Sequence, residues 1–189
     1  MKLVSFIGRP GCGKGTQAEQ IIKKTKWEPI YTGKLLRARA KKNDFMGNKI
    51  EEALSQGRLI PTPMVFNIWM PKLIEFKKSG TVEGVLFDGN PRKLYEAKML
   101  DEVFEIFEWE DFTPIHIDIS RKESKRRLLE RGRADDHEEE IERRLAWFET
   151  DVKPVLDYYR ERGILKTVDG EKSIEEVQED IVKILKIDD

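Results

Sequence analysis

The sequence predicts an α/β fold in which a parallel sheet is covered by helices on both faces. Apolar runs of strand length alternate along the chain with longer amphipathic segments, and this alternation is typical of a parallel sheet. A glycine-rich turn directly follows the first apolar run, and Asp88 ends a later one. Because ligands of such sheets bind beyond the carboxyl ends of the strands, we expect both features at one binding crevice.

The N-terminal half of the chain alternates strand, loop and helix. The apolar run 1–7 is predicted to be a buried strand, and Pro29 stops the first helix, so the residues around it are extended. Thr32 and Thr62 are expected to cap helices, and Gly57 is expected to end one. The elements expected here are a strand at 1–7, a helix at 17–26, an extended segment at 27–31, and helices from 32, at 49–56 and at 62–78.

The C-terminal half continues the same alternation. Ile115, Ile117 and Ile119 fall on one side of a predicted strand, because alternate strand residues point to the same face. A long amphipathic helix is expected to be bent by Pro154, and Ser173 is expected to cap the last helix. The elements expected here are strands at 84–88, 112–119 and 164–168, and helices at 95–107, 122–131, 137–162 and 173–187.

The composition is that of one polar domain. The 189 residues are 39% hydrophobic and 38% charged, with a net charge of −1, so the bulk charge gives no sign of nucleic acid or membrane binding. No apolar run reaches the length of a membrane span. The single cysteine, Cys12, can form neither an internal disulfide nor a cysteine zinc site, and a lone thiol suits a reducing, cytoplasmic setting. His116 alternates with apolar residues and is expected in the sheet or core.

The segment Gly-Arg-Pro-Gly-Cys-Gly-Lys-Gly-Thr-Gln at 8–17 predicts a phosphate-binding loop between a strand and a helix. Its glycines let the backbone turn tightly, so that N–H groups approach an anion, and the helix start adds further donors. Lys14 supplies a mobile positive charge for the outer phosphates, and Cys12 is expected to face them. Gly15 stands where Ser or Thr usually follows the lysine, so direct contact with Mg²⁺ would fall to Thr16 or pass through water.

This loop resembles the first motif of the adenylate kinases and related short nucleoside monophosphate kinases. Similar motifs follow in order: Tyr-Thr-Gly-Lys-Leu-Leu-Arg at 31–37, Asp-Gly-Asn-Pro-Arg at 88–92, a basic run at 125–136 and Asp-Gly at 169–170. The resemblance covers nearly the whole chain. It implies a P-loop nucleoside triphosphate hydrolase-like sheet in a single kinase domain, 1–189, with a small helical acceptor-binding insertion at 31–60. It also implies a minimal lid, reduced to a vestigial turn at 131–136.

The resemblance further implies a phosphotransferase that reversibly moves the terminal phosphoryl of MgATP to AMP, giving two ADP. Arg37 and Arg92 look like clamps on the acceptor phosphate, a task that suits planar, bidentate guanidinium groups. The ATP site would be Gly11, Cys12, Gly13, Lys14, Gly15, Thr16, Arg127, Arg131, Gly170 and Lys172. The AMP site would be Thr32, Gly33, Arg37, Arg58, Leu59, Ile60, Gly89, Asn90, Arg92, Glu96, Arg133 and Arg144. The catalytic residues would be Lys14, Arg92, Arg127, Arg133 and Arg144.

Magnesium and the remaining charged residues have simpler interpretations. Asp88 ends an apolar strand, where an acid suits a hydrated Mg²⁺, so it is expected to hold the metal through water. Arg126 and Arg143 are interpreted as solvated helix-face residues in ion pairs three or four residues apart. The expected partners are ATP and AMP, with neither nucleic acid nor membrane, and the sequence leaves monomer and homo-oligomer open.

The chain departs from the family pattern in three places. Only Gly132 separates Arg131 from Arg133, so the lid is almost absent, which exposes ATP to hydrolysis during transfer. Asn90 replaces the usual aromatic residue of the Asp-Gly-Phe/Tyr-Pro-Arg motif. Glu96 stands where these enzymes usually carry a glutamine that reads the acceptor base, and an ionised glutamate only accepts hydrogen bonds.

Two alternatives stay open at this point. The first is a kinase for GMP, UMP or CMP, because guanine presents two donors that match a carboxylate at position 96, although Thr32 matches the adenylate kinase form. The second is a P-loop ATPase or nucleotide-binding switch without an acceptor. Arg37 and Arg92 argue against the second alternative, since a pure ATPase has no use for a second phosphate site.

Overall fold

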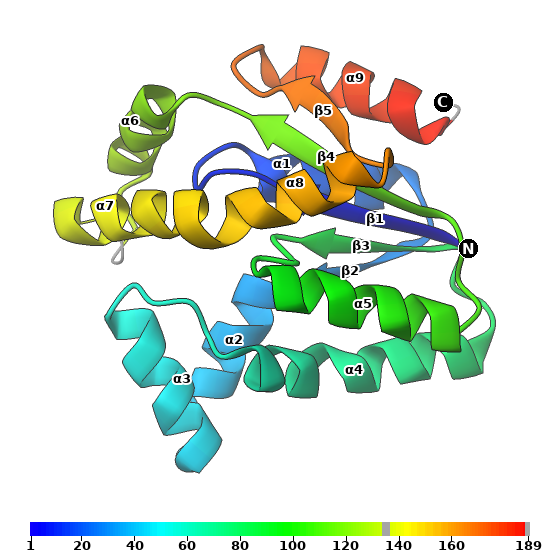
Figure 1. The fold of residues 1–189 in the computed structure, drawn as a ribbon, viewed down its shortest axis with the longest axis horizontal. Helices are drawn as coiled ribbons and strands as arrows, with labels where there is room; N and C mark the ends of the chain where they lie inside the picture. Colours follow the sequence, from blue (N-terminus) through cyan, green and yellow to red (C-terminus); the bar gives the residue numbers. More distant parts are fainter. Residues whose placement is uncertain (134–136, 188–189) are drawn as a thin grey trace.

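A parallel sheet of five strands, in the order β2-β3-β1-β4-β5, forms the centre of the computed structural model, which describes residues 1–133 and 137–187 (Figure 1). Its strands are β1 (Lys2–Ile7), β2 (Trp27–Tyr31), β3 (Gly84–Asp88), β4 (Phe112–Asp118) and β5 (Lys166–Asp169). Every strand pair runs parallel. The α/β fold class expected from the sequence is therefore confirmed.

Helices cover both faces of this sheet (Figure 1). Leu3 and Phe87 point to one face, which packs against α4 and α5, whereas Val4 and Phe6 point to the other, which packs against α1 and α9. The helices are α1 (Lys14–Lys24), α2 (Thr32–Ala40), α3 (Phe45–Ser55), α4 (Thr62–Ser79), α5 (Leu94–Ile106), α6 (Arg121–Arg131), α7 (Glu138–Trp147), α8 (Lys153–Glu161) and α9 (Ile174–Leu185).

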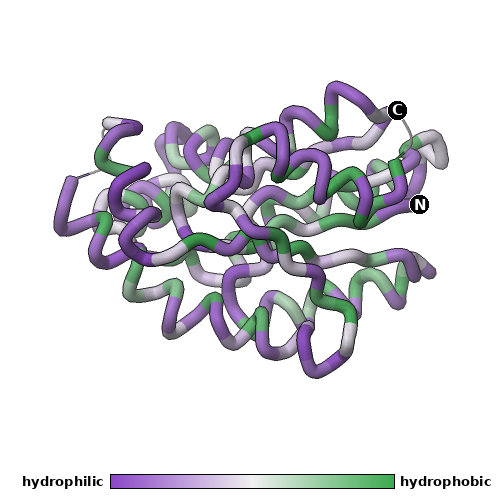
Figure 2. Tube along the Cα trace, turned by 90° about the horizontal axis from the view of Figure 1, so that it is seen from above, coloured by the Kyte–Doolittle hydropathy of each residue, from purple (hydrophilic) through white to green (hydrophobic). Residues whose placement is uncertain are grey.

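Hydrophobic residues are concentrated in the interior of the molecule. In Figure 2 the hydrophobic stretches, in green, run mostly through the middle, and the outer turns of the helices are mostly hydrophilic. Leu3, Val4 and Phe6 are fully buried in the central strand, as expected for a strand covered on both faces. Within the described ranges, none of the helices combines the length and the apolar character needed to span a bilayer.

The sheet register places two loops side by side. In the pairing of β1 with β3, Phe6 lies opposite Asp88, and the Gly89 amide donates to the Phe6 carbonyl at 3.2 Å. The loop that precedes α1 and the turn that precedes α5 therefore begin side by side, at the carboxyl ends of the neighbouring strands β1 and β3. This is the shared crevice that the sequence predicts.

Several helix ends differ from the expected ones. Thr32 and Thr62 are the first residues of α2 and α4, and the cap positions belong to Tyr31 and Pro61. Neither helix receives a side-chain cap from the described residues. The helix expected at 49–56 begins earlier, at Phe45, because Asp44 caps α3 by accepting from the Gly47 amide at 2.8 Å. A cap needs extended backbone, which Asp44 has and the two threonines, already helical, lack.

The long helix expected at 137–162 is interrupted. A π-helical turn, Phe148–Val152, separates α7 from α8, and Pro154 lies in the first turn of α8. Proline has no backbone N–H and its ring collides with the carbonyl four residues earlier, so the wider turn just before it relieves that clash. Phe148 and Val152 are buried in this turn, whereas Glu149 faces solvent.

Replacing Ser173 by alanine is expected to destabilise the protein by about 1 kcal/mol. The Ser173 hydroxyl accepts from the Glu176 amide at 3.2 Å, and the Glu176 carboxylate accepts from the Ser173 amide at 3.0 Å. The variant loses half of this capping box at the start of α9. Urea unfolding followed by circular dichroism measures the loss. Ser55→Ala is the control, because the Ser55 hydroxyl donates to a carbonyl at a helix end; equal midpoints for both variants would contradict the prediction.

Candidate active site

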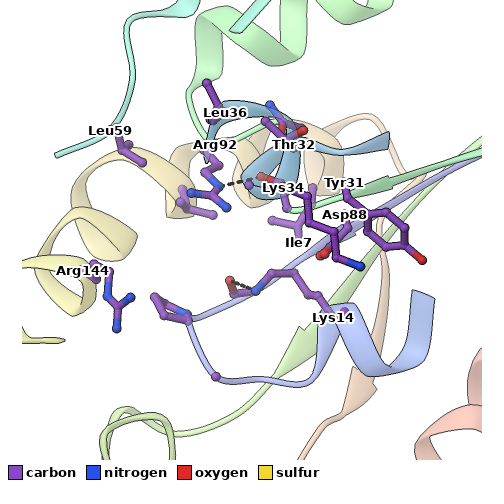
Figure 3. Close-up of a pocket in the computed structure, with 18 of the residues that line it drawn as sticks. Ile7, Lys14, Tyr31, Thr32, Lys34, Leu36, Leu59, Asp88, Arg92 and Arg144 are labelled. Carbon is purple, nitrogen blue, oxygen red and sulfur yellow. Dashed lines mark hydrogen bonds between the residues drawn. The ribbon is translucent and has the colours of Figure 1, made fainter. Parts of the chain in front are cut away.

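A cleft of about 490 Å³ opens at the carboxyl ends of β1 and β3 (Figure 3). The phosphate-binding loop and the start of α1 form one side, and the turn 88–92 and α2 form the other. Figure 3 shows the side chains of Lys14 and Arg92 on either side of the same space. The two stretches that the sequence assigns to different phosphates therefore line one cleft.

The backbone of the phosphate-binding loop requires glycine at particular positions. A Cβ at Gly8 would lie 2.5 Å from the Ile117 carbonyl oxygen, so β4 approaches too closely for any side chain there. Gly13, at φ 97°, caps α1 in a left-handed conformation that favours glycine. The Lys14 ammonium donates to the carbonyls of Gly8 at 2.8 Å and Arg9 at 2.9 Å. The lysine thus lies over the loop at the mouth of the cleft.

Cys12 does not face the phosphate side as expected. Its side chain is 2% exposed and packs in the apolar cluster between the sheet and α1, and it is absent from the cleft wall. Its amide donates to the Arg9 carbonyl at 3.2 Å, which closes a tight turn within the loop. The loop therefore turns this small apolar side chain inward while the ammonium of Lys14 lies above it, 3.3 Å from the sulfur.

Arg9 joins the phosphate-binding loop to the π-helical turn, a role that the sequence does not reveal. Its guanidinium donates to Glu149 at 2.8 Å and to the Ile119 carbonyl at 3.0 Å, and lies 4.4 Å from the Phe148 ring centroid. His116 stacks on the same ring, and burial lowers the pKa of its imidazole to about 4. His116 is therefore a neutral core residue at physiological pH, as expected.

Arg92 is the centre of the acceptor side. Its Nε donates to the Gly89 carbonyl at 2.6 Å, and its guanidinium lies 5.7 Å from the Trp147 ring centroid. Burial lowers the pKa of the Arg92 guanidinium, while the carboxylates of Glu96 and Asp88 raise it. Because an arginine stays protonated in proteins, this buried positive charge favours an anionic ligand.

Further arginines from other helices line the same cleft. Arg37 comes from α2, Arg144 from α7, and Arg127 from α6, where its Nε donates to Glu123 at 2.6 Å. Arg131 and Arg133 also belong to the cleft wall. Arg126 and Arg143 face away, in ion pairs with neighbouring glutamates of their own helices, which agrees with their interpretation from the sequence.

The cleft wall also contains a group of apolar residues and a group of buried polar residues, which we call the apolar slot and its polar edge. Leu36, Leu59, Ile60 and Val65 supply its apolar wall. The polar edge is formed by Thr32, Asn90 and Glu96, which are 2%, 1% and 2% exposed. Within the part of the chain that the structure describes, Thr32 Oγ1 and Asn90 Oδ1 have no hydrogen-bond partner. Buried polar atoms without partners are unusual in proteins, and here they mark a surface that can bind a polar planar group.

Some residues expected at the site lie outside the cleft wall. Arg58 pairs with Glu52 at 3.3 Å, and Lys172 pairs with Asp180 at 2.7 Å. Gly170 packs under the side chains of β4, with its amide on the Asp118 carbonyl at 2.7 Å. In the expected lid turn, 134–136 lie outside the described residues. The other expected residues line the cleft: Gly11, Gly13, Lys14, Gly15, Thr16, Thr32, Gly33, Arg37, Leu59, Ile60, Asp88, Gly89, Asn90, Arg92, Glu96, Arg127, Arg131, Arg133 and Arg144.

The cleft also contains residues that sequence reasoning missed. Trp147 lies one turn after Arg144 on α7, so helical spacing from the arginine could have found it. Tyr31 and Lys34 lie at the outer rim, with the ammonium of Lys34 4.0 Å from the Tyr31 ring centroid and 3.2 Å from Glu19. Nothing in the sequence distinguishes Lys34 from the many solvated lysines.

The residues around Asp88 fit a hydrated divalent cation. A Cβ at Gly15 would lie 3.6 Å from Asp88 Oδ2, so this carboxylate faces the first turn of α1, where Thr16 lines the cleft. Carboxylate and hydroxyl oxygens are ligands that Mg²⁺ accepts. Over the described ranges no three acidic, histidine or cysteine residues gather as a metal cage. A magnesium ion here would therefore depend on phosphate oxygens and water for most of its ligands.

Comparison with known proteins gives a consistent result. The model of the adenylate kinase family matches residues 6–164. The chain is 36% identical to an adenylate kinase of Leptospira biflexa, covering 97% of this chain and 99% of the relative. It is 37% identical to an adenylate kinase of Azobacteroides pseudotrichonymphae, covering 98% and 96%. It is 33% identical to human adenylate kinase isoenzyme 1, covering 93% and 90%.

Proposed function

The chain belongs to the adenylate kinase family, and we propose that it transfers the terminal phosphoryl of MgATP to AMP, reversibly giving two ADP. The observation that carries this proposal is the pairing of two anion sites in one cleft. The phosphate-binding loop with Lys14 forms the first, and Arg92 with Arg37 and Arg144 forms the second. Two such sites are what a reaction between two nucleotides needs, and an ATPase without an acceptor needs only one.

The cationic residues act by position and charge. Lys14 holds the outer phosphates of ATP, and Arg92 orients the phosphate of AMP for in-line attack. Arg127, Arg133 and Arg144 line the same cleft, which supports a role for them in stabilising the charge on the transferring group. The acceptor phosphate is already ionised, so the reaction requires no general base. Arg131 contacts the ATP side, and the roles of Arg58, Gly170 and Lys172 in nucleotide binding stay predictions.

Asp88 would hold magnesium through water, and Thr16, which lines the same cleft next to Gly15, would offer its hydroxyl. Held there, the ion would supply positive charge against the charge that develops during transfer. The chain's own contribution is the orientation of Asp88, fixed by its place at the end of β3 next to the first turn of α1. The single cysteine has no second cysteine for an internal disulfide, which suits a reducing, cytoplasmic setting for the enzyme.

The acceptor-binding insertion at 31–60 contacts α7. It contains α2, α3 and the residues after them, and Figure 1 shows α3 below α7. A Cβ at Gly57 would lie 3.8 Å from Cγ of Glu140, so the end of this insertion meets the start of α7. This contact joins the insertion to α7, and both elements supply residues to the cleft wall.

Coupled enzyme assays test the proposed function directly. With ATP as donor, AMP is expected to be the preferred acceptor among AMP, GMP, UMP and CMP, and ADP is expected to form from the purified protein. ATP consumption without any monophosphate is expected to be slow by comparison. Preferred turnover of another monophosphate would overturn the choice of AMP, and equal consumption without an acceptor would indicate an ATPase.

A further inference from the structure

The cleft contains a buried carboxylate that the roles above leave unexplained. Glu96, on the first turn of α5, is 2% exposed and lies on the polar edge of the apolar slot beside Arg92. Its Oε2 atom accepts from the Arg92 amide at 2.7 Å and from Asn90 Nδ2 at 3.4 Å. Both of these donors contact Oε2, and the Lys93 amide is a further donor to the carboxyl. The side chain belongs to the cleft wall, where a ligand can reach it.

The slot is the place for the base of the acceptor nucleotide. It adjoins Arg92, which under the proposed function holds the acceptor phosphate, and its wall of Leu36, Ile60 and Val65 suits the faces of a flat ring. The polar edge then meets the edge of the base. Adenine presents an acceptor, N1, beside a donor, its exocyclic amine. An ionised carboxylate has no donor for N1, whereas a neutral carboxylic acid has one donor and one acceptor.

We propose that Glu96 contacts the base of AMP as the neutral carboxylic acid, so that AMP binding takes up one proton from solvent. The acid O–H, on Oε1, donates to adenine N1. The carbonyl oxygen, Oε2, keeps the Arg92 amide as a donor and accepts from the exocyclic amine in place of Asn90, whose 3.4 Å contact is the longer of the two. The ionised form of the same side chain instead accepts from N1–H and the exocyclic amine of guanine. Protonation of one residue would thus set the preference between AMP and GMP. This inference rests on the proposed function of the cleft.

The charges around Glu96 agree with a carboxyl that can exist in both states. Burial raises the pKa of the Glu96 carboxyl, and the amide hydrogen bonds and charges of Arg92 and Lys93 oppose that rise. Arg37 from α2, Arg144 from α7 and Asp88 from β3 gather around the Arg92 guanidinium rather than around Glu96 itself. The anionic phosphate of AMP neutralises part of this positive charge when it binds, which favours the neutral acid further.

The pH dependence of acceptor preference tests the proposal. AMP and GMP carry the same kind of phosphate group, which titrates near a pKa of about 6. The effect of this titration therefore cancels in the ratio of kcat/KM for AMP to kcat/KM for GMP. Between pH 6 and pH 8.5 this ratio is expected to fall by roughly tenfold or more, since one mismatched polar contact costs about 1–3 kcal/mol. The variant Glu96→Gln carries a donor and an acceptor at every pH, so its ratio is expected to stay flat and its AMP affinity at pH 8.5 to exceed that of the wild type.

Calorimetry supplies a second readout that a purely structural role would not change. AMP binding is measured in two buffers of different ionisation enthalpy; the wild type is expected to take up part of a proton, and Glu96→Gln none. Glu102→Gln is the matched control, because Glu102 is an exposed residue of the same helix, and it is expected to behave as the wild type. A flat ratio in the wild type, or binding without proton uptake, would overturn this inference while leaving the kinase assignment intact. A protein that accepts no AMP at any pH would overturn both.

Discussion

Replacing Lys14 by methionine is expected to reduce turnover by about a hundredfold to a thousandfold, because removing one electrostatic contact to a transition state costs roughly 2.7–4 kcal/mol. The ammonium lies over the phosphate-binding loop, 2.8 Å from the Gly8 carbonyl, where it can turn to the outer phosphates of ATP. Methionine keeps most of the length and volume of the side chain but removes the charge. Initial rates with saturating ATP and AMP measure the effect.

The fold of the Lys14→Met protein is expected to stay intact, because Lys14 lies in the wall of the cleft rather than in the core. Thermal unfolding by circular dichroism checks this. Lys23→Met is the matched control, since Lys23 is an exposed lysine later on α1, and it is expected to retain full activity. If Lys14→Met kept more than about a tenth of wild-type turnover, Lys14 would have no transition-state role.

Local patterns predict most of this fold because the sheet imposes strong requirements on its sequence. Strands buried on both faces must be apolar throughout, and loops at their carboxyl ends must satisfy tight turns, so strand positions and the phosphate-binding loop could be read directly. The position of the π-helical turn could not be predicted in this way. Phe148 and Val152 are both buried in it, so apolar spacing continues across the wider turn and gives no sign of it.

Predictability of the site depends on whether the partners of a residue are local. Lys14 and Arg92 lie in short motifs next to strand ends, so their place at the crevice follows from the sheet alone. Arg9 is different, because its partners Ile119 and Glu149 lie far along the chain and only the folded structure brings them to the loop. A long cationic side chain can also bind either a ligand or a nearby acidic residue. Lys172 pairs with Asp180, and no sequence motif indicates this pair.

Replacing Arg92 by alanine is expected to lower kcat/KM for AMP by roughly a hundredfold or more, while ATP affinity changes far less. A hydrogen bond to a charged group contributes about 1.5–3 kcal/mol, and a bidentate guanidinium makes two to a phosphate. Arg92 is fixed for this task by its Nε bond to the Gly89 carbonyl at 2.6 Å and by Trp147. Steady-state kinetics with varied AMP, together with calorimetric titration of ATP, measure the two sides separately.

Two further variants decide whether the effect belongs to the guanidinium itself. Arg92→Lys keeps the charge but lacks the planar pair of donors, so it is expected to recover only part of the AMP affinity. Arg143→Ala removes an exposed arginine of α7 that pairs with Glu140 at 2.9 Å and does not line the cleft, and it is expected to be fully active. The loss of Arg92 also leaves the Asp88 and Glu96 carboxylates without their main counter-charge, so thermal unfolding of each variant is recorded as well. If the affinities for AMP and ATP fell equally in Arg92→Ala, Arg92 would be a structural residue of the turn and not a clamp on the acceptor phosphate.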